Sequence, residues 1–198
     1  SLFCDVPRQA VIVGLDTSQT YEIPLAFEEQ GLTRLLLEGL RLPENPPDHR
    51  EWHEVMEGLR APEDGVTVAI VGKYIELRDA YISVSEALKH GGIANKCQVR
   101  LKWVDSEHVE EAAPAEFLSD VHGILVPGGF GPRGVEGKIQ AIRYAREKQV
   151  PFLGLCLGLQ TAVIEFARNA CGLGGAHSTE FDQNAPHPVI ALLASQRG

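Results

Sequence analysis

The sequence predicts an α/β fold in which helices cover both faces of a parallel β-sheet. From residue 66 onward, short runs of apolar residues alternate with longer segments of helical periodicity. The apolar runs are continuous, which is typical of strands buried on both faces. Glycine-rich segments follow two of these runs, and parallel sheets bind ligands at the carboxyl ends of their strands.

The individual elements follow from these patterns. The expected strands are residues 66–71, residues 99–104, a third strand ending at 124–126, and residues 152–155. Helical spacing of Tyr81, Val84 and Leu88 predicts a helix over residues 79–90. Two more helices are expected over residues 135–147 and 157–169.

The N-terminal third has a different organisation. We expect a short strand at residues 10–13 and one or two helices within residues 25–42. Residues 43–65 contain four prolines and indicate a linker, with room for a short helix over residues 48–59.

Residues 1–42 hold too few elements for an independent domain, so they are expected to end a domain whose core lies upstream. The first residue is serine, which also predicts an excerpt of a longer protein. The predicted boundaries are therefore residues 1–42, a linker at 43–65, and a second domain at 66–198.

Composition restricts the partners. Acidic residues outnumber basic ones 27 to 18, which argues against a nucleic-acid surface or an anionic membrane. No apolar stretch approaches the roughly 18 residues of a membrane span. The four cysteines form no Cys-x-x-Cys pair or zinc-ligand spacing, which predicts a cytoplasmic protein without a metal site in this chain.

Cys156 is the candidate nucleophile. It follows an apolar run and is flanked by Gly154 and Gly158, after which the pattern becomes helical. This arrangement resembles a nucleophile elbow, in which a sharp turn exposes the reactive atom at the end of a strand. A helix N-terminus favours a thiolate. The residues alone leave a second interpretation open, a buried packing cysteine between two glycines.

A second glycine-rich segment, Val-Pro-Gly-Gly-Phe-Gly, occupies residues 126–131. It lacks the Gly-Lys-Ser/Thr ending of a phosphate-binding loop. An oxyanion hole for acyl transfer is the functional interpretation, with donors from the N–H of Leu157 and the N–H of Gly129 or Phe130. A flexible loop without chemistry is the alternative.

These motifs together carry a family resemblance. Pro-Gly-Gly-Phe-Gly, followed 27 residues after Gly129 by Cys156, is similar to class I glutamine amidotransferases. The finer resemblance is to the CTP synthase family, and the matching segments cover essentially the whole chain. They are Phe3–Pro7, Tyr21–Pro24, Val71–Tyr74, Asp79–Val84, Glu86–His90, Arg133–Lys138 and Ser178–Phe181.

The resemblance implies a flavodoxin-like class I glutaminase domain, present in part, after the remnant of an α/β synthetase (amidoligase) domain. It implies a ligase of pyrimidine biosynthesis that releases ammonia from glutamine at Cys156 and uses it to convert UTP to CTP. The implied catalytic residues are Cys156, Leu157 and Gly129. The implied glutamine-binding residues are Gly129, Leu157, Gly158, Leu159, Gln160 and Glu180.

The resemblance also implies nucleotide sites and an assembly. Leu15, Asp16 and Thr17 match a segment that contacts the adenine of ATP, which acts with Mg²⁺ at sites mostly upstream of this chain. A lid through which GTP activates glutamine hydrolysis is implied at Phe130, Arg133, Gly134 and Glu136. The full-length protein is expected to be a homotetramer.

The histidine that activates the thiol is not evident. The family pairs its cysteine with a downstream His-x-Glu, and of the seven histidines just His177 and His187 follow Cys156, both without that glutamate. His49 and His108 have a glutamate at the right spacing, but in the linker and on a helix surface, where both are interpreted as solvated.

Two classes of function therefore remain open. One is a segment of an active CTP synthase whose base-bearing residues lie downstream. The other is a catalytically inactive glutaminase-like module for binding or assembly. A single-domain cysteine hydrolase with the same elbow is a weaker alternative, because the synthetase-like segment argues against it.

Overall fold

The computed structural model describes residues 5–45, 47–60, 64–73, 75 and 77–193, and these residues form two compact units that divide at residues 61 and 62. Pro46 and residues 61–63 of the predicted linker lie outside the described residues. Among the described residues, no helix has the length and apolar character needed to cross a bilayer.

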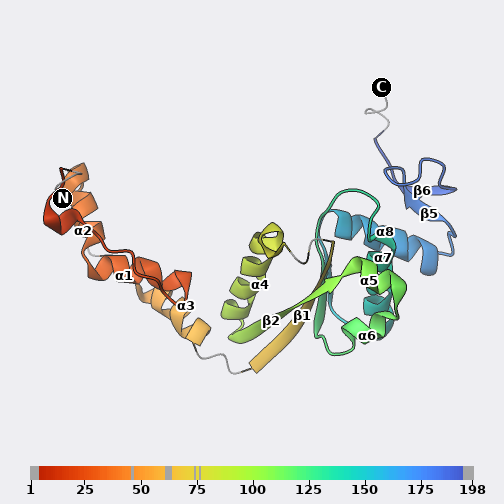
Figure 1. Ribbon diagram of the computed structural model, residues 1–198, viewed down its shortest axis with the longest axis horizontal. Coiled ribbons are helices and arrows are strands. Elements are labelled where there is room, and N and C mark those ends of the chain that lie inside the picture. Colours follow the sequence, from red (N-terminus) through yellow and green to blue (C-terminus); the bar gives the residue numbers. More distant parts are fainter. Residues whose placement is uncertain (1–4, 46, 61–63, 74, 76, 194–198) are drawn as a thin grey trace. The chain divides into compact units, whose positions relative to one another are not determined.

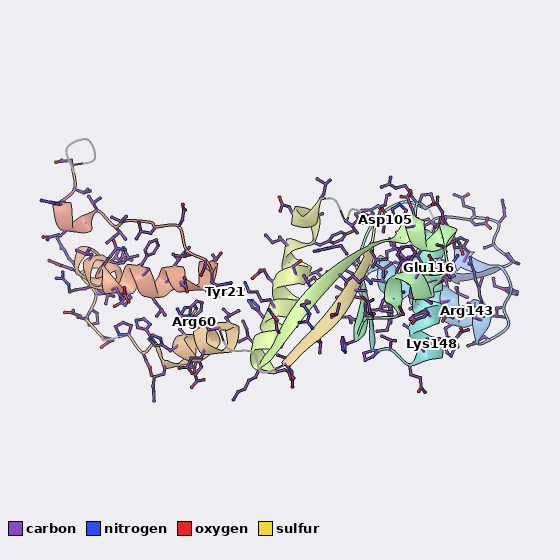
Figure 2. All side chains as sticks on the ribbon, turned by 60° about the horizontal axis from the view of Figure 1, so that its bottom comes forward. Tyr21, Arg60, Asp105, Glu116, Arg143 and Lys148 are labelled. Atoms are coloured by element: carbon purple, nitrogen blue, oxygen red, sulfur yellow. The ribbon has the colours of Figure 1, made fainter. Side chains whose placement is uncertain are left out.

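The first unit is helical. It contains α1 (Ile23–Glu29), α2 (Leu32–Leu40) and α3 (Arg50–Arg60), with short 3₁₀ turns at Arg8–Ala10 and Thr20–Glu22. The indole N–H of Trp52 on α3 donates to the carbonyl of Tyr21 at 2.8 Å, and Arg60 pairs with Glu22 at 3.1 Å. Tyr21 and Arg60 are labelled in Figure 2, where both belong to this unit. The helix predicted at residues 48–59 is thus confirmed, and it is joined to the segment before it.

The strand predicted at residues 10–13 is wrong. The 3₁₀ turn ends at Ala10, and the residues that follow it pair with no strand in the described part of the chain. The amide and carbonyl of Val13 instead bond to the side chain of Gln30 at 2.8 and 3.1 Å. A glutamine amide therefore replaces the partner strand that the apolar pattern at residues 10–13 presupposes.

The second unit is built on a four-stranded sheet. Its strands are β1 (Asp64–Gly72), β2 (Cys97–Asp105), β3 (Gly123–Val126) and β4 (Phe152–Gly154), in the order β2-β1-β3-β4. Every pairing is parallel, as predicted. The order is the flavodoxin-like one, which places a ligand crevice outside the carboxyl ends of β1 and β3.

Helices connect and cover these strands. They are α4 (Ile82–Ala94), α5 (Ser106–Glu111), α6 (Pro114–Leu118), α7 (Val135–Lys148) and α8 (Leu157–Asn169). Helix α7 packs against α5 and α8, and α4 packs against β2, well apart from these helices (Figure 1). The side chain of Asp105 starts α5 by accepting the N–H of Glu107 at 2.8 Å.

The core lies between the sheet and α7. Apolar residues of β1, β2 and β3 meet residues of α5, α6 and α7, and every buried member of this cluster is less than 5% exposed. A second, two-stranded parallel sheet of β5 (Ala176–Ser178) and β6 (His187–Ile190) was not predicted. Its residues Val189 and Ile190 pack on Val135, Ile139 and Ile164 of α7 and α8, which attaches it to the unit.

One edge of the sheet presents apolar side chains to solvent. Strand β4 pairs with β3, and no strand lies on its other side in the described residues. Leu153 at this edge is 51% exposed, and Phe166 on α8 is 55% exposed. Exposed apolar side chains, when they form a patch, commonly mark an interaction surface.

A glycine on α7 permits the contact between α7 and α5. A Cβ added at Gly137 would lie 1.7 Å from the carbonyl oxygen of Ser106, whereas one added at Gly91 of α4 meets no atom within 4 Å. We expect Gly137→Ala to lower the free energy of unfolding by about 3 kcal/mol or more through overpacking. The matched variant Gly91→Ala should be neutral, or stabilising by about 0.5–1 kcal/mol. Urea unfolding measures both, and equal effects would contradict this packing.

Candidate active site

Cys156 sits at a strained turn between β4 and α8. It is the N-cap of α8, with φ of 53° and ψ of −110°, a conformation that a side chain-bearing residue rarely adopts. The turn is held by the N–H of Leu155, which donates to the carbonyl of Val126 at 2.9 Å, and by the N–H of Gly158, which donates to the carbonyl of Leu155 at 2.8 Å. The thiol is free and Cys156 is exposed, so it is not a packing cysteine.

The flanking glycines let the turn close. A Cβ at Gly158 would lie 2.0 Å from the carbonyl oxygen of Val126, and one at Gly154 would lie 2.6 Å from the carbonyl of Gly158. No side chain fits at either place. The first turn of α8 therefore rests directly on the end of β3, and Cys156 projects from the junction.

The glycine-rich loop after β3 lies beside the thiol. A Cβ at Gly128 would lie 3.4 Å from the Cβ of Cys156 and 3.9 Å from its Sγ. In the described part of the chain, the amides of Gly128, Gly129, Phe130 and Leu157 donate no hydrogen bond to a protein acceptor. The structure thus brings together the predicted thiol and free N–H groups at the ends of two neighbouring strands.

Two lysine side chains lie close to the loop, and one of them bonds to it. Nζ of Lys73, which follows β1, donates to the carbonyl of Phe130 at 3.0 Å. Lys138 on α7 is 1% exposed, and its Nζ lies 3.6 Å from the position of a Cβ on Gly129. Burial, and then the positive charge of Lys73, lowers the pKa of Lys138 below its usual 10.5.

Two residues of the segment implied as a GTP lid form ion pairs with neighbouring elements. Arg133 pairs with Glu107 at 2.7 Å, and Glu136 accepts two hydrogen bonds from Arg168 at 2.8 and 3.0 Å. Gly134 starts α7 with φ of +72°, which glycine adopts without strain. Phe130 at the tip of the loop is 83% exposed. A ligand that contacts Arg133 has to compete with the carboxylate of Glu107.

The remaining site residues lie farther along the chain. Leu159 and Gln160 belong to the first turn of α8, and the N–H of Gln160 donates to the carbonyl of Cys156 at 3.1 Å. Glu180 lies in an exposed turn after β5, and its N–H donates to Ser178 Oγ at 3.2 Å. No hydrogen bond or ion pair of the described residues joins Glu180 to Cys156.

The candidate histidines His177, His108 and His49 form no hydrogen bond with Cys156 in the described residues. Nε2 of His177 on β5 lies 4.0 Å from Oε1 of Glu136, and its ring packs at a tilt of 53° against the ring of Phe181, with 5.8 Å between the ring centroids. His108 is exposed, as predicted. The interpretation of His49 as solvated is wrong, because it is half-buried and its Nε2 is shielded from solvent. Its carbonyl accepts the N–H of His53 at 2.9 Å, which fixes His49 at the start of α3.

The segment implied to contact ATP borders a small pocket in the first unit. The pocket measures about 60 Å³ and is lined by Leu15 and Thr17 together with apolar residues of α1. Ligand pockets usually measure about 300–1,000 Å³. The pocket in the described residues is therefore too small to enclose a nucleotide by itself. The described residues also contain no cluster of three or more His, Cys, Asp or Glu that suits a metal ion.

The two lysines were missed by the sequence analysis as site residues. Val135, Lys138, Ile139 and Ile142 recur at helical spacing, so Lys138 occupies a position on the apolar face of its helix. This placement was a signal that the lysine is buried. Lys73 carried no such signal, because its contact depends on how two loops meet.

The strained turn at Cys156, the glycine-rich loop beside it and the flavodoxin-like sheet are the features expected of a class I glutamine amidotransferase domain, and comparison with known proteins agrees. Residues 76–192 match the profile of the family described as glutamine amidotransferase class-I. The chain belongs to this family.

The particular relatives are CTP synthases. The whole chain is 53% identical over 197 residues to the CTP synthase of Desulfitobacterium hafniense, and 51% identical over 203 residues to that of Methanocaldococcus jannaschii. It spans 37% and 38% of their lengths. Nothing in these similarities supports the alternative of an inactive binding or assembly module.

A solved structure shows the same fold. The glutaminase domain of Trypanosoma brucei CTPS, determined with bound acivicin, superposes with a TM-score of 0.63 at 40% sequence identity. The match covers 67% of this chain and 52% of that one. The flavodoxin-like glutaminase fold is therefore confirmed for the second unit.

The burial of the Lys138 ammonium can be tested through the pH dependence of the free energy of unfolding. Because its pKa is lowered in the folded state, the unfolded chain binds more protons between that lowered pKa and 10.5, and stability rises with pH across this window. We expect Lys138→Met to remove this rise and to increase the free energy of unfolding at pH 7 by about 1–3 kcal/mol. Unfolding of both proteins at several pH values measures it. Equal pH dependence in both would contradict the buried charge.

Proposed function

We propose that this chain forms the thiol-bearing part of a CTP synthase that hydrolyses glutamine. The observation that carries the proposal is the exposed Cys156 at a strained turn, with the unpaired amides of Leu157 and Gly129 on its two sides. The similarity to CTP synthases over the whole chain supports glutamine as the substrate and CTP formation as the use of the ammonia. The whole protein's ligase activity is part of this proposal.

The chemistry follows from the geometry. The thiolate of Cys156 attacks the carboxamide carbon of glutamine, and the electron pair of the C=O bond moves to the oxygen. The amides of Leu157 and Gly129 hold this oxyanion. When the C=O bond re-forms, the C–N bond breaks and the nitrogen leaves as ammonia after it receives a proton. Water then cleaves the thioester, which releases glutamate and restores the thiol.

The neighbouring residues have supporting roles. Gly158, Leu159 and Gln160 place the first turn of α8 under the substrate, and Glu180 supplies an acidic group for the α-ammonium of glutamine. Glu180 reaches the substrate if the turn after β5 closes over Cys156. The lid residues Phe130, Arg133, Gly134 and Glu136 would respond to GTP as an activator.

The general base would come from elsewhere in the full-length protein. The apolar edge formed by β4 and α8, together with the 52% coverage of the Trypanosoma brucei glutaminase domain, supports a further part of the glutaminase that packs on this edge. We infer that this part carries the His-x-Glu pair. The inference is independent of His177, which pairs with Glu136.

The remaining assignments concern the whole enzyme. We infer that residues 1–42 end the synthetase domain, that 43–65 connect it to the glutaminase domain, and that UTP, Mg²⁺ and most of the ATP site belong to other parts of the protein. Leu15, Asp16 and Thr17 would contribute one side of an adenine contact. A cytoplasmic homotetramer is proposed from the family resemblance.

Selective labelling tests the nucleophile. A chloroketone analogue of glutamine should alkylate Cys156 in the full-length protein, because its carboxylate and ammonium direct it to the site beside the elbow. Cys4, Cys97 and Cys171 should stay unmodified, and an excess of glutamine should protect Cys156. Peptide mass spectrometry identifies the modified cysteine. Even labelling of all four thiols would contradict the assignment.

Comparing glutamine with free ammonia as the nitrogen source tests whether Cys156 serves glutamine hydrolysis and not the synthetase reaction. In the full-length protein, Cys156→Ala should abolish CTP formation from glutamine and leave CTP formation from free ammonia within about twofold of wild type. The control Cys171→Ala should leave both activities unchanged, because Cys171 lies beyond the end of α8. Loss of both activities in Cys156→Ala with intact folding would argue that Cys156 serves the synthetase reaction instead.

A further inference from the structure

Lys138 is a buried cation placed against the backbone of the glycine-rich loop. Its Nζ and the Leu157 side chain lie 3.6 and 3.8 Å from the same point, the position of a Cβ on Gly129. One residue earlier, a Cβ added at Gly128 would lie 3.4 Å from the Cβ and 3.9 Å from the Sγ of Cys156. The thiol of Cys156 is therefore close to Gly128, and the ammonium of Lys138 is close to the next residue, Gly129.

This ammonium has no compensating partner in the described residues. It donates no hydrogen bond there and no carboxylate pairs with it, while the charge acting on it is the like charge of Lys73. A buried, unpaired charge is costly, and a hydrophobic side chain of similar size would be more stable at this position. A lysine at such a place indicates that a negative charge arrives near it during function.

The positive charge of Lys138 can act on the orientation of the peptide groups in the glycine-rich loop. In a trans peptide the C=O and N–H groups point in opposite directions, so a cation that attracts a carbonyl turns the next N–H away from itself. Lys73 shows this arrangement, since its Nζ holds the carbonyl of Phe130 at 3.0 Å. Nζ of Lys138 makes no such hydrogen bond in the described residues, but it lies 3.6 Å from the position of a Cβ on Gly129, close enough for its charge to act on the peptide between Gly128 and Gly129.

We propose that Lys138 is a positioning residue of the oxyanion hole, whose unpaired ammonium orients the Gly129 amide toward Cys156 and stabilises the negative charge that forms there. This inference rests on the proposed glutamine hydrolysis. The charge is unfavourable in the resting protein and is compensated when the oxyanion forms, so it favours the transition state over the ground state. Lys138 acts through the Gly129 peptide and does not touch the substrate.

The test compares variants of the full-length protein. Lys138→Met and Lys138→Gln remove the charge, and Lys138→Arg retains it. Lys148→Met is the matched control, because Lys148 is an exposed lysine at the far end of the same helix. Figure 2 shows Lys148 at the opposite end of the unit from Asp105, and Asp105 lies at the carboxyl end of β2. Folding of each variant is checked by thermal unfolding.

Glutamine hydrolysis is the first readout. Lys138→Met and Lys138→Gln should lower kcat about tenfold with KM within about twofold, a smaller loss than the 10²–10³ caused by removing a direct oxyanion donor. Lys138→Arg should recover most of the rate and Lys148→Met all of it. The wild-type rate should fall on the alkaline side as Lys138 loses its proton, and this fall should be absent in Lys138→Met.

The rate of Cys156 alkylation by the chloroketone analogue is a second readout that needs no turnover, and it should fall in the two uncharged variants. If wild type hydrolyses glutamine and the uncharged variants keep its kcat and pH profile, the role of Lys138 is overturned and the proposed function stands. If wild type neither hydrolyses glutamine nor is labelled at Cys156, the proposed function fails and this inference fails with it.

Discussion

The whole site depends on the contact between the backbone of α8 and the backbone of β3 at Gly158. The carbonyl of Val126 occupies the space in which a side chain at Gly158 would stand. Because of this contact, α8 begins directly over the end of β3, and the turn that connects β4 to α8 has no room to relax. The strained backbone of Cys156 is the result of this packing.

The same contact aligns the two glycine-rich segments. Val126 is the last residue of β3, so the atom that meets Gly158 also begins the loop that carries Gly128 and Gly129. The thiol and the loop amides are therefore positioned by one junction, and not by two independent loops. Preorganised donors of this kind need no rearrangement when negative charge develops, which is why they contribute strongly to catalysis. A buried lysine beneath the loop is consistent with a site that favours negative charge.

Much of the fold was accessible from the sequence because the patterns are local. Continuous apolar runs predicted the four parallel strands, and Gly154 and Gly158 predicted the turn at Cys156. The failures arose where distant residues decide the outcome. Residues 10–13 have the composition of a strand, but Gln30 satisfies the backbone of Val13 in its place. The small sheet of β5 and β6 exists because apolar residues of α7 and α8 give it a surface to pack on. The burial of Lys138 could have been predicted from its helical position, whereas the anchor from Lys73 to the loop could not, because it joins two loops 57 residues apart.

Direct observation of the covalent intermediate is the strongest test of the proposal that Cys156 is the nucleophile of a glutaminase. The full-length protein would be mixed with glutamine, quenched in acid within the first turnovers and digested for peptide mass spectrometry. We expect a γ-glutamyl group on the peptide that contains Cys156, and its loss on treatment with hydroxylamine, which cleaves thioesters. Glutamine turnover without any γ-glutamyl group on Cys156, or with the group on another residue, would contradict it.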